Sequence, residues 1–179
     1  MAEAFSNSLT RAVGVVTTYS GSSVGIASTA ITVTAATGIG VSDLVDNANF
    51  IAGTRVHSIV GTKVYVDRAS TNTAAATAQI VNFLGVTTAY TSPSGTKSIL
   101  IGGTFANNTD SQVTLTVEVF DQSADTTVGI AHKIPVPTGS SFVISDAGKT
   151  LLEGLDEVRV YSDTAGAIDV NLSILTGVS

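Results

Sequence analysis

The stretch Gln112–Phe120 decides the fold, and it reads Gln-Val-Thr-Leu-Thr-Val-Glu-Val-Phe. One face of it is apolar and consists of Val113, Leu115, Val117 and Val119. The other face is polar and consists of Thr114, Thr116 and Glu118. Strict alternation at period two is typical of a strand with one buried face, whereas a helix repeats its apolar residues every three or four positions. We therefore expect a β-strand here, packed on one side.

The same alternation recurs along the C-terminal half of the chain. Further strands are expected at Lys97–Thr104, Gly129–Ile134, Ser141–Ile144, Glu157–Tyr161 and Ile168–Leu175. Polar turns separate them at sandwich-like spacing, so we expect an all-β protein whose C-terminal part is an antiparallel β-sandwich, Ig-like or jelly-roll-like. Leu115, Val117, Leu172 and Ile174 are the expected core. Pro135 and Pro137 cannot donate ladder hydrogen bonds, which places them at a sheet edge or outside the sheet.

The N-terminal half shows shorter strand patterns. Strands are expected at Arg11–Thr18, Ala30–Thr34 and Gln79–Leu84, with a turn at Ser20–Ser23. Residues 69–78 could form a short helix, which their alanines favour, or an extended loop, which their Thr and Asn residues favour, and we expect the loop. Phe50–Asp67 predicts two strands that flank Val60-Gly61, because glycine adopts the positive φ that a tight turn needs. Val64 and Val66 should face inward.

These patterns predict two consecutive small β domains with a boundary near Gly85–Thr88. The expected division is an N-terminal arm over residues 1–10, an N-terminal β domain over residues 11–87 and a C-terminal β-sandwich domain over residues 88–179. The arm is polar and turn-prone, and it is expected to be loose or to become ordered on a neighbouring molecule.

The composition excludes several classes of function. Charged residues make up 12% of the 179 residues, about half the usual share in a soluble domain. The net charge of −6 and the pI of about 4.6 argue against a nucleic-acid-binding surface, which would be basic and clustered. No apolar run approaches the roughly 18 residues of a membrane helix. There is no cysteine, and the N-terminal residues lack the apolar segment of a signal peptide, so we expect synthesis in a cytoplasm.

The candidate residues for a catalytic or metal site are expected to have structural or solvated roles instead. His57 and His132 stand in strand patterns without further ligands, and a zinc site needs three or four nitrogen or sulfur ligands. The loop carboxylates Asp110, Asp121 and Asp125 do not follow the EF-hand spacing for calcium, and Asp156 with Glu157 forms another acidic pair that is expected to be solvated. Serines are abundant, but nucleophilic catalysis would need a serine or threonine beside a base that a third group holds in place. We expect no enzyme activity, no cofactor and no metal.

A series of turn and strand segments between Thr88 and Leu175 has a recognisable order. The segments are Ala89–Thr96, Asn107–Thr109, the strand Val113–Val119, Ile134–Ser141, Leu151–Gly154 and Ala165–Val170. In these segments the chain resembles a module of tailed-phage virion proteins. The whole chain is similar to small virion structural proteins of marine cyanophages, particularly T4-like myoviruses. The resemblance implies a role in assembly, a location in the virion and synthesis in the bacterial host cytoplasm. It implies no catalytic residues.

The resemblance and the low charge together imply a non-enzymatic virion protein on the head exterior or the head–tail neck, with a decoration, cement or collar role. The expected partners are further copies of the chain and other virion proteins such as capsid, portal, neck or tail proteins, because a surface with few charges is poorly protected against association. Neither a nucleic acid nor a membrane is expected as partner. Two alternatives are a tail- or fibre-associated protein that binds a host receptor or glycan, and a carbohydrate-processing virion enzyme.

Overall fold

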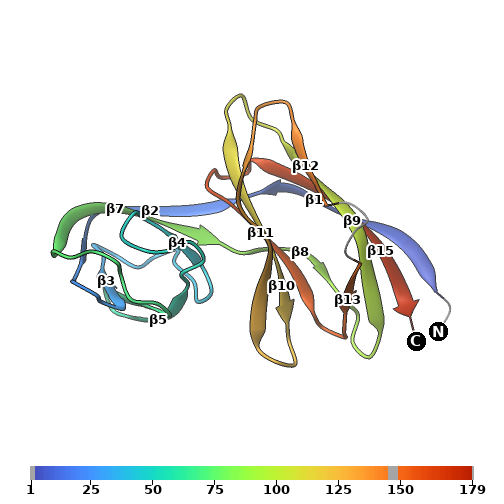
Figure 1. Ribbon diagram of the computed structural model, residues 1–179, viewed down its shortest axis with the longest axis horizontal. Coiled ribbons are helices and arrows are strands. Elements are labelled where there is room, and N and C mark those ends of the chain that lie inside the picture. The colour runs from blue at the N-terminus through green and yellow to red at the C-terminus, as the bar shows by residue number, and fades with distance from the viewer. Residues whose placement is uncertain (1–2, 145–148, 179) are drawn as a thin grey trace. The chain divides into compact units, whose positions relative to one another are not determined.

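The computed structural model describes residues 3–144 and 149–178, and every regular element in this part of the chain is a β-strand (Figure 1). The expected all-β class is thereby confirmed. The chain divides into two compact units. The inserted unit is Val15–Val86, and the sandwich unit joins Met1–Gly14 to Thr87–Ser179. The boundary expected after residue 87 lies one residue from the observed junction between Val86 and Thr87. The two units are not consecutive in the sequence, however, because the N-terminal segment belongs with the C-terminal half.

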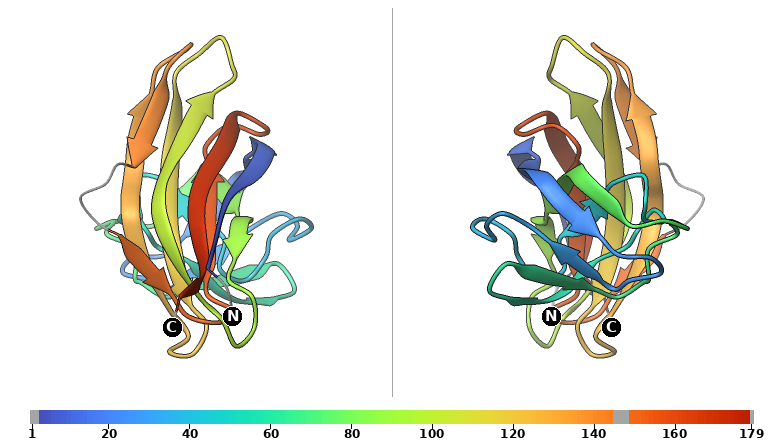
Figure 2. Two further views of the ribbon diagram at one scale, coloured as in Figure 1. Left: turned by 90° about the vertical axis from the view of Figure 1, so that its right-hand side faces the viewer. Right: turned by 90° about the vertical axis from the view of Figure 1, so that its left-hand side faces the viewer.

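The first sheet of the sandwich unit is antiparallel throughout. Its order is β1 (Ala4–Val13), β15 (Ile168–Val178), β9 (Lys97–Asn107) and β12 (Ser141–Ile144), and β13 (Thr150–Leu152) also pairs with β9. The left view of Figure 2 shows β12, β9, β15 and β1 side by side. We call the side of this sheet that faces away from the core the outer face.

The second sheet of the sandwich unit has the order β11 (Thr126–Val136), β10 (Val113–Asp121), β14 (Glu157–Ser162) and β8 (Thr87–Thr91). All six strands expected after residue 96 are present, and most run one to three residues further than the pattern indicated. The sequence patterns missed β8 and β13, which have five and three residues. Pro135 lies in β11 at the edge of the sheet and Pro137 follows that strand, as expected.

The two sheets enclose one apolar core. Leu115, Val117, Leu172 and Ile174 are fully buried in it, which confirms the residues expected there. At the β1 end, the Ser8 and Thr10 hydroxyls donate to the Ala89 carbonyl of β8, over 2.8 and 3.4 Å. These bonds link the first sheet to the second where β1 and β8 are both edge strands.

The expectation of an N-terminal arm over residues 1–10 is wrong for the residues that the structure describes. Ala4–Val13 forms β1, which pairs with β15 from Ala4↔Thr176 to Val13↔Ile168. Small polar residues such as Ser6 and Ser8 are common in turns, which is why the sequence predicted a turn-prone segment. The backbone bonds to β15 and the hydroxyl bonds to Ala89 hold the segment extended instead.

The first strand was also expected in the wrong place. Arg11–Thr18 is split at Gly14, where β1 ends and β2 (Val15–Val24) begins. Gly14 has φ 125°, and a Cβ there would lie 2.2 Å from the Thr164 carbonyl oxygen. Only glycine combines this backbone angle with so close an approach. The chain therefore changes unit at a residue that no other side chain can replace without strain.

The inserted unit is one six-stranded sheet curled around its own apolar cluster. Its order is β4 (Leu44–Asp46), β7 (Ala76–Gly85), β2, β3 (Ala30–Thr32), β6 (Lys63–Val66) and β5 (Val56–Val60). Val64 and Val66 are buried, and Gly61 turns the β5–β6 hairpin with φ 60°, both as expected. The loop expected over residues 69–78 gives way to β7 at Ala76.

The turn expected at Ser20–Ser23 is wrong. These residues lie inside β2, where the register against β7 shifts between Tyr19 and Ser22. Gly21 has φ 74° and Ser22 is fully buried. A β-bulge uses the same small residues as a turn, because both need a local kink. No helix in residues 3–144 and 149–178 is long and apolar enough to cross a membrane.

Candidate functional site

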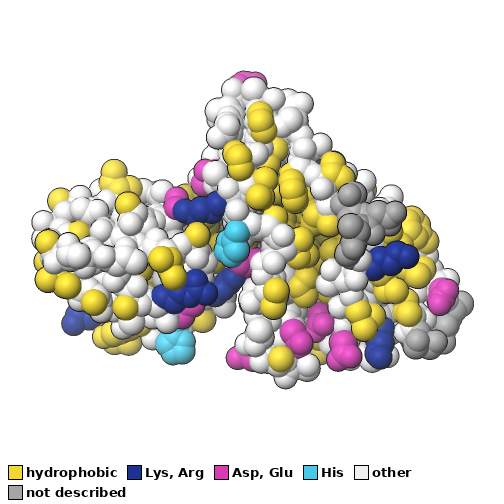
Figure 3. Space-filling model, viewed as in Figure 1, with side chains coloured by type: hydrophobic (Ala, Val, Ile, Leu, Met, Phe, Trp, Pro, Cys, Tyr) yellow, Lys and Arg dark blue, Asp and Glu magenta, His cyan; other side chains and the backbone are white. Residues whose placement is uncertain are grey.

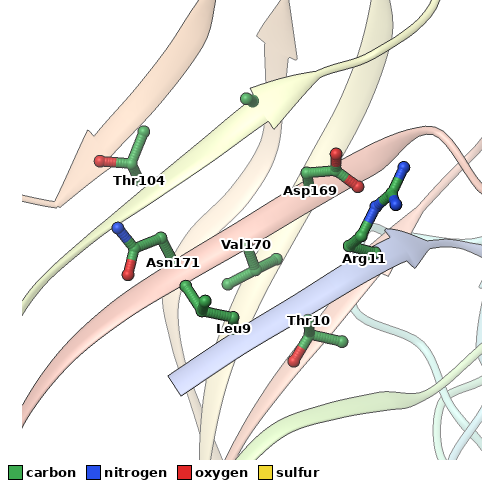
Figure 4. A pocket seen from close by; sticks show the side chains of 8 residues that line it. Leu9, Thr10, Arg11, Thr104, Asp169, Val170 and Asn171 are labelled. Carbon is green, nitrogen blue, oxygen red and sulfur yellow. The ribbon is translucent and has the colours of Figure 1, made fainter. Parts of the chain in front are cut away.

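A shallow pocket lies on the outer face of the sandwich unit, with a volume of about 330 Å³ (Figure 4). Three neighbouring strands supply its walls, and strand register brings the side chains together. Asn171 of β15 stands between Leu9 of β1 and Thr104 of β9. Two residues earlier on β15, Asp169 lies opposite Ala106. The pocket therefore combines residues that are up to 162 positions apart in the sequence, from Leu9 to Asn171.

Asp169 is oriented by a bulge in β1. The register between β1 and β15 shifts between Thr10 and Val13, and Ala12 there has φ 55°. This conformation points the Ala12 N–H at Asp169, whose Oδ1 accepts it over 2.9 Å. The Asn108 amide donates to the same oxygen over 3.3 Å. The carboxylate is thus held in place at the rim by two donors to one of its oxygens.

Arg11 extends from the same bulge and borders the pocket beside Leu9. Figure 4 shows the Arg11 and Asp169 side chains next to each other at one end of the pocket. Within residues 3–144 and 149–178, no hydrogen bond or ion pair engages the Arg11 guanidinium. A guanidinium with five donors, a carboxylate and the Asn171 amide can together bind a small polar molecule, with Leu9 as an apolar contact.

The rest of the outer face is largely apolar. One cross-strand row runs Phe5, Leu175, Ile99 and Leu151 over four strands. Phe5 is 65% exposed, Leu9 72% and Leu151 49%. Val143 of β12 lies opposite Thr104 and is 54% exposed. Single exposed apolar residues are ordinary, but several on one sheet face mark a surface for contact with another molecule. Hydrophobic side chains also show in Figure 3 over the visible side of the sandwich unit.

The histidines and loop carboxylates weighed in the sequence do not converge. His57 is exposed on β5 of the inserted unit, and His132 is exposed on β11 of the sandwich unit. Asp121 accepts hydrogen bonds from the Ala124 N–H and the Ser123 hydroxyl, and the Ala124 bond above all holds its pKa below the ordinary value. Asp110 lies in the exposed turn between β9 and β10. Across the described ranges, no three His, Asp or Glu side chains are arranged to hold a metal ion.

The expectation that Asp156 is a solvated turn carboxylate is wrong. Asp156 is buried, and its two oxygens accept hydrogen bonds from the Gln122 N–H over 3.1 Å and the Glu153 N–H over 2.8 Å. It therefore ties the β10–β11 turn to the turn before β14. Its neighbour Glu157 pairs with Arg159, whose Nε lies 2.7 Å from the carboxylate.

A buried carboxyl group on β10 was not apparent from the sequence. Glu118 was expected on the polar face, yet its side chain is fully buried. It lies opposite Arg159 of β14, and its Oε1 is 3.9 Å from Nε2 of His132. The Arg159 guanidinium also stacks on Phe120, 3.7 Å from the ring centre. The only sequence signal was a lone acid in a central apolar strand, and burial depends on neighbours that alternation cannot reveal.

Comparison with protein-family models, curated proteins and solved structures found no match to this chain.

Proposed function

We propose that the protein is a non-enzymatic structural component of a tailed-phage virion, located on the head exterior or the head–tail neck in a decoration, cement or collar role. Its partners are further copies of the chain and other virion proteins. The proposal joins the resemblance noted in the sequence to an all-β architecture with exposed apolar side chains on one sheet face.

The observation that carries the proposal is the outer face of the first sheet. Phe5, Leu9, Val143 and Leu151 are each about half exposed or more on one side of the sandwich unit. Contacts of this kind need no long charged side chains, because burying apolar atoms is the main driving force of permanent association. The charge fraction of 12% is consistent with a surface that is covered in its working state.

Purified particles of the phage that encodes the chain provide the test. Quantitative mass spectrometry should detect the protein at a fixed number of copies per major capsid protein, and antibody labelling in electron microscopy should place it on the head or neck. Hundreds of copies would indicate a shell protein, and tens or fewer a neck component. Particles that lack the protein although the infected cells contain it would contradict the proposal.

A second function, recognition of a host glycan, is favoured by the pocket on the outer face. Its volume of about 330 Å³ is at the lower end for ligand pockets, which suits a single sugar unit. Asp169, Asn171 and Arg11 offer hydrogen-bonding groups for hydroxyls, and Leu9 offers an apolar contact for a C–H face. Glycan-array binding that Asn171→Ala abolishes and His57→Ala leaves unchanged would support this function. An array without any bound glycan would count against it.

A further inference from the structure

The edge strands of the three sheets differ in how well they are protected against pairing. β4, β5, β8, β12 and β13 have five residues or fewer. β11 is long, but it carries Lys133 and Pro135 and shifts register twice against β10. Short length, charge, proline and bulges are the usual means by which proteins prevent a sheet edge from binding another strand.

β1 is the exception among these described edges. From Ala4 to Thr10 it contains no charged residue, no proline and no register shift. It pairs with β15 on one side only. The residues Ala4–Asn7 are all exposed, as is Leu9. On the side away from β15, β1 thus has seven consecutive residues whose backbone groups pair with no other strand, and it carries exposed apolar side chains. Edge strands of this kind can pair with a strand of another molecule.

The sequence around β1 is complementary to itself. Asn7 is the centre of Glu3-Ala4-Phe5-Ser6-Asn7-Ser8-Leu9-Thr10-Arg11. In an antiparallel pair of two identical copies centred on Asn7, Ser6 lies opposite Ser8 of the second copy. Phe5 then lies opposite Leu9 of the second copy, and Glu3 opposite its Arg11. The apolar pair and the oppositely charged pair each occur twice, once on either side of the twofold axis.

We infer that two copies of this chain associate through β1, antiparallel and centred on Asn7, so that the two first sheets become one continuous sheet. Leu9 lies opposite Asn171 on the outer face, and the alternation of side chains along β1 places Phe5, Asn7 and Arg11 on the same face. The pairing covers Phe5 and Leu9, which are 65% and 72% exposed in the single chain. It gives the Arg11 guanidinium an acidic partner, Glu3 of the second copy.

This inference rests on the self-association within the proposed function, but not on the virion. Sedimentation velocity of the full chain at micromolar concentrations tests it directly. The wild type should be a dimer. Glu3→Arg and Arg11→Glu each place like charges opposite each other at two positions, so each should weaken the dimer roughly tenfold. Lys63→Glu, a charge reversal at an exposed strand position of the inserted unit, is the matched control and should dimerise like the wild type.

Mixing the two interface variants provides the decisive comparison. In a mixed dimer, both introduced charges lie opposite a residue of opposite sign, so the equimolar mixture should dimerise about as tightly as the wild type. Leu9→Asp changes an exposed residue and leaves the core intact. It should be monomeric by sedimentation velocity and folded by circular dichroism. A monomeric wild type, interface variants that dimerise unchanged, or a mixture no tighter than its components would each overturn the inference. The virion assignment is tested separately on purified particles.

Discussion

Glu118 places a carboxyl group on the central strand β10 with its side chain fully buried. Removing one partner from a buried charge cluster is more costly than removing an exposed ion pair, because the remaining charges lose their counterpart without regaining water. Here the group left behind would be Arg159, which lies opposite Glu118 on β14, is mostly buried and keeps its ion pair with Glu157, whereas His132 is exposed to water.

We expect Glu118→Ala to destabilise the protein by about 3 kcal/mol. Urea unfolding followed by circular dichroism measures the difference. Asp110→Ala, at an exposed turn residue, is the control and should change stability by less than about 0.5 kcal/mol. An unchanged midpoint for Glu118→Ala would mean that the Glu118 carboxyl is not buried in solution.

Asp43 gives the inserted unit a pH dependence. Burial raises its pKa above the ordinary 3.8, although the Gly40 N–H donates to the carboxylate over 2.7 Å and opposes the shift. The folded state then binds the proton more tightly than the unfolded state, so this residue's contribution to stability falls as pH rises through its folded pKa. Asp43→Asn should remove that fall. Thermal unfolding of both proteins between pH 3 and 7 tests it, and parallel pH profiles would contradict it.

At the scale of elements, alanine substitutions at two glycines with positive φ distinguish the cost of backbone strain from the cost of a steric clash. At Gly61, in the β5–β6 hairpin, an added Cβ meets nothing within 4 Å. At Gly14, between β1 and β2, it would meet the Thr164 carbonyl oxygen. Gly61→Ala should therefore cost about 1–2 kcal/mol through its φ alone. Gly14→Ala should cost at least about 3 kcal/mol. Denaturant unfolding ranks the two, and equal costs would contradict the close approach at Gly14.

The strands that the sequence predicted well are those with strict alternation, such as β10 and β15. Alternation reports one packed face, which is why Leu115 and Leu172 were expected in the core. It does not report a second covered face, and so the burial of Glu118 was missed. It also fails where small polar residues dominate. Ser8 in β1 and Ser22 in β2 are held in strands by distant backbone partners, and no local pattern encodes those partners.

At the scale of the whole chain, the inserted unit interrupts the sandwich unit between β1 and β8. Val15 pairs with Gly85, so the two ends of the inserted unit are antiparallel neighbours, roughly 5 Å apart between Cα atoms. A segment whose ends lie this close can be removed without stretching the remaining chain.

Replacing Val15–Val86 with a short Gly-Ser linker should leave a sandwich unit that melts cooperatively. Residues 87–179 alone should be less stable, because β15 then loses the pairing with β1. Calorimetry of both proteins tests the division. Equal stability would show that β1 contributes little, and no transition in either would show that both units share one cooperative structure.

Neither the pocket nor the exposed edge of β1 could be predicted from the sequence, because both depend on which strands are neighbours. Leu9, Asn171 and Thr104 become neighbours only through the register of β1, β15 and β9. The low charge led us to expect a surface for association, and proposing a position for it required the sheet order. The complementary residues on either side of Asn7 can be read in the sequence, but they indicate self-pairing only when Ala4–Val13 is known to be an edge strand.

The central claim is that this chain works by assembly, and that β1 is where one copy meets the next. The chain has no cysteine, so a single Asn7→Cys introduces one thiol at the expected twofold axis. Opposite residues of antiparallel strands have Cα atoms about 4.5–5.5 Å apart, within disulfide range. We predict that mild oxidation links Asn7→Cys into a covalent dimer, whereas Leu9→Cys, whose thiols would lie roughly 13 Å apart, stays unlinked. Equal linking of both variants, or none of Asn7→Cys, would contradict the claim.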